Sequence, residues 1–266
     1  MTKKIFISLL SSILILSCSK DKLENIHITR EATISSHIVN DNYKLYFFLP
    51  SDYNDNKKYP VIYLLDGDWH TVKVGEELNQ LWKDHAVSEC ILVGIGNSAQ
   101  RIRDYTYPAD QYNEGSGHAD KYYEFIRDEL IPYVDSCYST DSTQRIIAGH
   151  SLGGFFVLYA MFQSENETST FSGVIAASPS IWWVNAYLLG VEKDYSEIHT
   201  DLPVSLFFSA GSDEGVTNML NSEMKERLIN RGYNSFRTEQ MNFENKGHEE
   251  ASIPGFTEGI KFLLSN

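Results

Sequence analysis

The chain has 266 residues, of which 42% are hydrophobic and 22% are charged, and its formal net charge at pH 7 is −14. This composition is typical of one sizeable globular domain and excludes a disordered or fibrous protein. A chain this acidic, with no basic stripe, is a poor ligand for nucleic acid, so we expect no nucleic-acid partner.

The first 18 residues differ from the rest of the chain. Lys3 and Lys4 precede an apolar run at 5–16, which has the length of a secretory signal and is too short to span a bilayer comfortably. Residues 15–18 read ILSC, which resembles the lipobox of bacterial lipoproteins. This pattern predicts a signal peptide at 1–17, a lipidated Cys18 with a tether to residue 26, and a lipid anchor in the cell envelope, at the outer membrane or cell surface. The alternatives are a plain secretory signal and an uncleaved membrane anchor.

Residues 27–266 alternate between strand and helix patterns and form the predicted domain. Polar–apolar alternation at 27–29 and 44–49 predicts antiparallel edge strands. Short apolar runs predict strands buried on both faces at 61–65, 90–95, 145–148, 173–177 and 204–208, with a last strand at 235–241. Helical patterns cover 76–84, 120–134, 153–162, 218–230 and 256–264. This order predicts an α/β-hydrolase fold, in which antiparallel strands lead into a mostly parallel, doubly wound sheet.

Cys90 and Cys137 are the cysteines of the predicted domain. A disulfide between them is permitted in an oxidising envelope, but we expect two buried thiols. Neither cysteine has a histidine or a second cysteine at metal-binding spacing, so we expect no metal site.

A glycine-rich turn separates the predicted strand at 145–148 from the helix at 153–162. It reads GHSLGG over residues 149–154, a G-x-S-x-G pattern between a strand and a helix, which is the context of a nucleophile elbow. The glycines are needed because bulk beside the strained turn would clash with the neighbouring strand or helix. Ser151 is therefore the predicted nucleophile, and the N–H of Leu152 is a predicted oxyanion donor. His150 is expected to point away from the elbow and pack.

A serine nucleophile needs a base and an acid that orients it. In this fold class the chain order is serine, acid, histidine, and His248 is the histidine that follows the last plausible acid loop. The acid should follow the strand at 204–208, where Asp213 and Glu214 are both available. Glycine followed three residues later by an acid is a common form of this loop, which favours Glu214. The N–H of Asp68, after the strand at 61–65, is the predicted second oxyanion donor.

Several motifs occur in the order found in an esterase family of α/β-hydrolases. They are YLLDG at 63–67, RDYT at 103–106, ELIPY at 129–133, GHSLGG at 149–154, SPSIWW at 178–183 and GH at 247–248. The chain resembles that family over about residues 28–264, most of all its siderophore-esterase branch of the enterochelin and bacillibactin type. The family also includes feruloyl and acetyl-xylan esterases, S-formylglutathione hydrolases and mycolyltransferases. Its loop after the fifth strand reads Gly-Ser-x-Glu, which residues 211–214 match, so the resemblance also favours Glu214.

The predicted substrate-binding residues follow the strands at the same edge of the sheet. Trp182 and Trp183 follow the strand at 173–177 and offer an apolar wall for an aromatic acyl group or a sugar ring, unless they pack a lid. Arg101 and Arg103 follow the strand at 90–95, and Arg103 is predicted to bind an anionic siderophore, unless Asp104 or Glu129 pairs with it.

These residues together predict a serine carboxylic ester hydrolase that uses no metal or organic cofactor. Its expected partners are a small-molecule ester, of siderophore or aromatic and acetyl type, and a membrane through the lipid anchor. An acyltransferase of the same fold is one alternative, and a non-catalytic ligand-binding lipoprotein is another.

Overall fold

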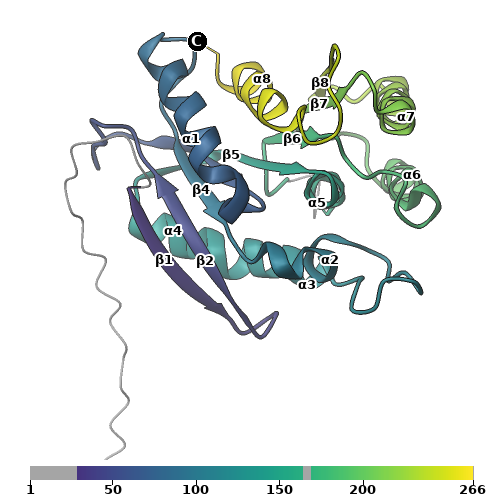
Figure 1. Ribbon diagram of the computed structural model, residues 1–266, viewed down its shortest axis with the longest axis horizontal. Helices are drawn as coiled ribbons and strands as arrows, with labels where there is room; N and C mark the ends of the chain where they lie inside the picture. The colour runs from purple at the N-terminus through teal and green to yellow at the C-terminus, as the bar shows by residue number, and fades with distance from the viewer. Residues whose placement is uncertain (1–28, 164–168, 266) are drawn as a thin grey trace, which may run out of the picture.

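A computed structural model describes residues 29–163 and 169–265 (Figure 1). The predicted signal peptide, Cys18, the tether and the first residues of the predicted domain lie outside the described residues. The strands are β1 (Arg30–Ser36), β2 (Asp41–Phe48), β3 (Tyr59–Leu64), β4 (Ile91–Ile95), β5 (Thr140–His150), β6 (Gly173–Ala177), β7 (Ser205–Gly211) and β8 (Arg237–Phe243). The helices are α1 (Gly67–Lys83), α2 (Arg101–Tyr105), α3 (Ala119–Phe125), α4 (Ile131–Cys137), α5 (Leu152–Met161), α6 (Trp183–Ile198), α7 (Gly215–Arg231) and α8 (Ser252–Leu264). A 3₁₀ turn (Ser98–Gln100) precedes α2, and a π-helical turn (Ile126–Leu130) joins α3 to α4.

All of these strands belong to one sheet, in the order β1-β2-β4-β3-β5-β6-β7-β8. The hairpin β1–β2 is antiparallel and joins β4 antiparallel, whereas every pair from β4 to β8 is parallel. Helices α1 and α8 cover one face and the remaining helices cover the other (Figure 1). The predicted α/β-hydrolase fold is confirmed.

Strand β3 shows why continuous apolar runs become central strands. Val61 and Tyr63 face the core under α3–α5, while Ile62 and Leu64 face the core under α1 and α8. Because successive side chains point to opposite faces, a strand covered on both sides must be apolar at every position. The two cysteines lie on opposite sides of the sheet, since Cys90 belongs to the core under α1 and α8, whereas Cys137, on α4, belongs to the other core. Both are buried thiols, as expected.

Two of the longer helices differ from the sequence-based expectation. Helix α1 begins at Gly67, well before residue 76, and its early buried positions include the polar His70 and Thr71. Helix α6 was not predicted, and its buried stripe includes Glu192, which is fully buried and ion-paired with Arg231. In both cases polar residues occupy core positions, so the apolar periodicity of a helix is hidden.

The carboxyl ends of the central strands share an unusual backbone. Strands β3, β4, β5 and β6 are each followed within two residues by a residue with positive φ, namely Asp66 (51°), Asn97 (91°), Ser151 (62°) and Ser178 (44°). Non-glycine residues adopt this region rarely, because the Cβ atom approaches the backbone. Strain is therefore concentrated at the edge of the sheet where the predicted site lies.

Within the described residues, no helix combines the length and the apolar character that crossing a membrane would require.

Candidate active site

Ser151 lies in a tight turn between β5 and α5, with φ 62° and ψ −118°. Its N–H donates to the carbonyl of Ala177 at 3.0 Å, which ties the turn to the end of β6. A Cβ atom at Gly149 would lie 2.3 Å from the carbonyl oxygen of Gly153, and one at Gly154 would lie 2.8 Å from the Cα of Pro179. The glycines are thus required by close backbone approach, as the sequence predicted, and they expose Ser151 at the start of a helix.

Glu214 and His248 are joined by a hydrogen bond of 2.6 Å between Oε2 of Glu214 and Nδ1 of His248. Glu214 follows β7 and caps α7, while His248 lies in the loop between β8 and α8. This contact leaves Nε2 of His248 for another partner. Asp213, the alternative acid, is exposed, and its carboxylate accepts a hydrogen bond from Ser212.

The second oxygen of Glu214 has two donors of its own. The hydroxyl of Ser178 and the N–H of Gly211 each donate to Oε1 at 2.7 Å. Burial alone would raise the pKa of the Glu214 carboxyl, but the hydrogen bonds from His248, Gly211 and Ser178 hold that pKa below its ordinary value. Glu214 is therefore ionised at neutral pH and fixed in one orientation.

His150 contacts the loop that carries His248. Its Nε2 is 3.0 Å from the carbonyl oxygen of His248, and the two imidazole rings lie 4.5 Å apart between centroids. Burial lowers the pKa of His150 to about 3, with the neighbouring His248 acting in the same direction. A neutral imidazole with a proton on Nε2 can donate to this carbonyl. The sequence predicted packing for His150 but not that it packs against His248, because the pairing joins residues 98 positions apart.

The two predicted oxyanion donors both lie at helix starts. Leu152 is the first residue of α5, and the first intrahelical bond in that turn is from Phe155 to the carbonyl of Ser151. Asp68 is the second residue of α1, whose first bonds come from Trp69 and His70 to the carbonyl of Asp66. N–H groups that precede such bonds have no partner within the helix and point along its positive end.

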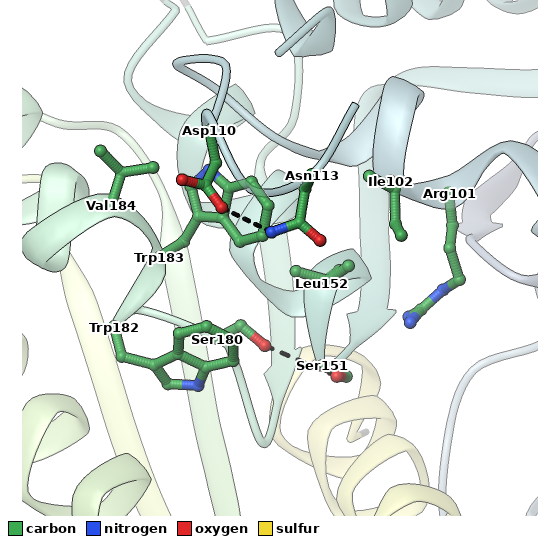
Figure 2. A pocket seen from close by; sticks show the side chains of 10 residues that line it. All are labelled: Arg101, Ile102, Asp110, Asn113, Ser151, Leu152, Ser180, Trp182, Trp183 and Val184. Carbon is green, nitrogen blue, oxygen red and sulfur yellow. Dashed lines mark hydrogen bonds between the residues drawn. The ribbon is translucent and has the colours of Figure 1, made fainter. Parts of the chain in front are cut away.

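A cavity of about 360 Å³ opens beside Ser151 (Figure 2). It is lined by Arg101, Ile102, Asp110, Asn113, Ser151, Leu152, Ser180, Trp182, Trp183 and Val184. The hydroxyl of Ser180 lies 3.5 Å from that of Ser151. Trp182 is 51% exposed, so its indole is available to a ligand. Trp183 is buried and donates from Nε1 to the carbonyl of Pro108 at 3.1 Å, which makes it part of the cavity wall.

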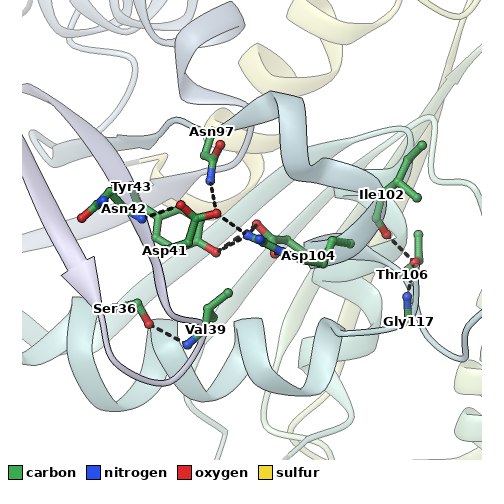
Figure 3. Close-up of polar contacts among 11 residues, drawn as sticks. Ser36, Val39, Asp41, Asn42, Tyr43, Asn97, Ile102, Asp104, Thr106 and Gly117 are labelled. Atoms are coloured by element: carbon green, nitrogen blue, oxygen red, sulfur yellow. Dashed lines mark hydrogen bonds and ion pairs between the residues drawn. The ribbon is translucent and has the colours of Figure 1, made fainter. Parts of the chain in front are cut away.

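Arg103, the predicted substrate-binding arginine, is not among the residues that line the cavity. Its guanidinium donates to Asp104 at 2.7 Å, to Asp41 at 2.9 Å and to the hydroxyl of Tyr43 at 3.2 Å. Asp41, Tyr43 and Asp104 lie close together in Figure 3. The structure therefore favours the alternative interpretation, in which Arg103 forms structural ion pairs with Asp104 and Asp41.

Arg101 lines the cavity instead. Its Nε and one terminal nitrogen donate to the two carboxylate oxygens of Asp66 at 3.1 and 3.0 Å, and the same terminal nitrogen donates to the carbonyl of His150 at 3.2 Å. Burial raises the pKa of the Asp66 carboxyl, while Arg101 acts in the opposite direction. The forked geometry is that of a guanidinium bound to a carboxylate, so the pair is ionic.

One group in the described residues has the residue types of a metal site. His150, His248 and Glu249 each offer one potential ligand atom, and these atoms lie within 4.8 Å of one another. However, His248 is bound through Nδ1 to Glu214 and His150 through Nε2 to a carbonyl. The group thus overlaps the candidate histidine of the triad, and one ring nitrogen of each histidine is already bound to a protein oxygen.

The fold and the sequence both have known relatives. The chain is 28% identical over 261 residues to the "Ferri-bacillibactin esterase BesA" of Bacillus subtilis, with 89% of each chain covered. It is 32% identical over 171 residues to the "Siderophore triacetylfusarinine C esterase" of Aspergillus fumigatus, covering 58% of this chain and 56% of that protein. The crystal structure of the BES protein from Bacillus cereus superposes with a TM-score of 0.80 at 24% identity, covering 93% of this chain and 99% of that one.

These relatives support an esterase function. A family model described as "Putative esterase" matches residues 36–257, which is most of the chain. The chain therefore belongs to this esterase family of α/β-hydrolases.

Proposed function

We propose that the chain is a serine carboxylic ester hydrolase in which Ser151 is the nucleophile, His248 the general base and Glu214 the orienting acid. The observation that carries this proposal is the 2.6 Å contact between Glu214 and Nδ1 of His248, in a loop packed against the elbow through His150. An imidazole held at Nδ1 by a carboxylate presents Nε2 as a base and is stabilised once protonated.

The reaction follows from this geometry. The Ser151 hydroxyl oxygen attacks the ester carbonyl carbon while Nε2 of His248 takes the hydroxyl proton. The N–H groups of Leu152 and Asp68, at the starts of two helices, stabilise the oxyanion. When the tetrahedral intermediate collapses, His248 returns the proton to the leaving alcohol. Water, deprotonated by His248, then hydrolyses the acyl-enzyme and restores Ser151.

A siderophore-type ester is the proposed substrate class. Two relatives are esterases of siderophores by name, and one of them is similar along nearly the whole chain. Trp182 and the apolar side chains of Ile102 and Val184 offer the cavity surface that an aromatic acyl group requires.

Kinetics on the purified chain test this proposal. Hydrolysis of a catechol trilactone, ethyl ferulate and p-nitrophenyl acetate is compared between the wild type and Ser151→Ala. Loss of the nucleophile should lower kcat by about 10⁴-fold or more, because residual catalysis then comes from oxyanion donors and binding alone. Ser196→Ala, on α6 and outside the cavity lining, should keep wild-type rates. Unchanged rates in Ser151→Ala would overturn the mechanism, and cleavage of ethyl ferulate alone would overturn the substrate class.

We also propose that Cys18 is lipidated and anchors the chain in the cell envelope, after removal of residues 1–17. The lipobox-like ILSC pattern supports this proposal. Radiolabelled palmitate should enter the full-length chain expressed in a bacterial host, and Cys18→Ala should abolish both labelling and recovery in the membrane fraction. Labelling that persists in Cys18→Ala would exclude this cysteine.

A further inference from the structure

We infer that Asp110 is a specificity-determining residue, which makes the cavity select an uncharged ester with free hydroxyl groups over the anionic metal complex of the same ester. This inference rests on the proposed esterase function and names the form of the substrate that the site accepts.

The positive charge of the cavity is already balanced. Of the residues that line it, Arg101 and Asp110 are the charged ones. The Arg101 side chain is 19% exposed and forms a bidentate ion pair with Asp66, whose side chain is fully buried. A guanidinium committed to a buried carboxylate adds little net attraction for a second anion, because the field of the pair falls off quickly.

The second arginine of this region is neutralised in the same way. Arg103 pairs with Asp41 and with the buried Asp104, outside the cavity. Both arginines that follow β4 are therefore bound to carboxylates of the protein, Arg101 to Asp66 and Arg103 to Asp41 and Asp104.

Asp110 has no such counter-charge. It lies half-buried in the loop between α2 and α3, and its side-chain partner is the uncharged amide of Asn113 (Figure 2). Within residues 29–163 and 169–265, no cation forms an ion pair with it. Among the residues that line the cavity, the charged groups are thus Arg101, which Asp66 balances, and the carboxylate of Asp110, which no cation balances. A carboxylate of this kind repels an anionic ligand and accepts hydrogen bonds from hydroxyl groups.

This distinction separates two forms of one siderophore. The hydroxyl groups of a metal-free catechol ester can donate to Asp110. When the same oxygens bind ferric ion they have lost their protons, so the donors disappear and the complex carries net negative charge. One substitution therefore tests both consequences, since removing the charge of Asp110 should favour the ferric form and disfavour the metal-free form.

Asp110→Asn should remove the charge without disturbing the loop, because the backbone of this residue makes the hydrogen bonds that hold the loop. The N–H of Asp110 donates to the hydroxyl of Ser116 at 2.8 Å, and its carbonyl accepts from the N–H of Asn113 at 3.1 Å. Both bonds survive in the variant, and the new amide oxygen can still accept from Asn113. Glu114→Gln removes one negative charge from the same loop at an exposed position outside the cavity lining and serves as the matched control.

The experiment measures kcat/KM for a catechol trilactone in metal-free and ferric forms, with p-nitrophenyl acetate as an uncharged reference. The wild type should prefer the metal-free form by about 10-fold or more, and higher ionic strength should narrow this preference. Asp110→Asn should lower the ratio of kcat/KM for the metal-free form to kcat/KM for the ferric form by about 3- to 10-fold. Glu114→Gln should leave this ratio within about twofold of the wild-type value.

A wild-type preference for the ferric form, or an unchanged ratio in Asp110→Asn, would overturn the inference. In either case Ser151-dependent cleavage of p-nitrophenyl acetate would still support the esterase function. Absence of that cleavage would instead reject the esterase function itself.

Discussion

Two segments meet at the cavity, and they are built in different ways. The elbow, residues 149–154, is a run of consecutive residues whose glycines allow close backbone approach, within the turn at Gly149 and to Pro179 at Gly154. The cover, which we define as residues 98–118, is held by partners distant in the sequence, including Asp66, Asp41 and Trp183. The position of the nucleophile therefore depends on close backbone contacts, whereas the wall that meets the substrate depends on long-range side-chain pairs.

This contrast predicts that substitutions in the two segments have different effects. A change in the elbow acts directly on the position of Ser151. A change in the cover breaks a side-chain ion pair or hydrogen bond. It can therefore alter the charge of the cavity while the nucleophile stays in place. Substitutions in each segment should separate these effects.

The largest expected effect is that of breaking the ion pair which anchors the cover. Arg101→Met leaves Asp66, which is fully buried, without its cation. We expect the free energy of unfolding to fall by about 3–5 kcal/mol, because an unpaired buried charge is costly. Denaturant unfolding measures this change.

The matched control for Arg101→Met is the double variant with Asp66→Asn, which removes both charges. Asparagine tolerates the positive φ of position 66, so the double variant should recover part of the lost stability. A double variant less stable than Arg101→Met would show that the charge pair is not the source of the loss.

A smaller effect is expected from breaking the elbow. In Gly149→Ala the new Cβ would lie 2.3 Å from a backbone oxygen of Gly153, so the turn must shift. We expect a loss of about 1–3 kcal/mol in stability and a loss of about 10²-fold in kcat, because Ser151 moves with the turn. Gly190→Ala, at an exposed position inside α6 where no atom lies within 4 Å of the new Cβ, should leave kcat unchanged and raise stability by up to about 1 kcal/mol, because alanine favours a helix more than glycine does. Wild-type kcat in a folded Gly149→Ala variant would show that the position of Ser151 does not depend on the close backbone approach at Gly149.

The smallest effect depends on pH and involves His70, whose ring lies 6.0 Å from that of His150. Burial, followed by the charge of Arg101, lowers the pKa of His70 from 6.5 to about 4. Between these values the unfolded chain binds more protons than the folded one, so stability falls as the pH falls. His70→Phe removes this contribution. When the pH is lowered from 7 to 5, the free energy of unfolding of the variant should therefore fall by about 2 kcal/mol less than that of the wild type. Parallel Tm profiles for the two proteins would refute the assignment.

The same contrast explains what the sequence could predict. The central strands and the helix that follows Ser151 have continuous apolar patterns, and the order of strands and helices identified the fold. The elbow was predictable because residues 149–154 are contiguous, and the resemblance to a known loop pattern favoured Glu214, which does contact His248.

The remaining features depend on pairs that no local pattern shows. Arg101 and Arg103 are two residues apart and equally basic, so the sequence does not tell which one reaches the cavity. Their roles are decided by Asp66 and Asp41, which are distant in the chain. Helix α6 was missed for a similar reason, since the burial of Glu192 depends on Arg231 from α7.

The positive φ values at the ends of β3, β4, β5 and β6 have a consequence for laboratory evolution. Glycine adopts such backbone angles without steric cost, so a screen that rewards heat resistance alone should favour glycine at Ser151 or Ser178. Those same changes would delete the proposed nucleophile or the hydroxyl that holds Glu214. Heat-resistant variants of this chain should therefore be selected with an activity assay in every round, because the residues whose replacement relieves strain are the ones on which the proposed chemistry depends.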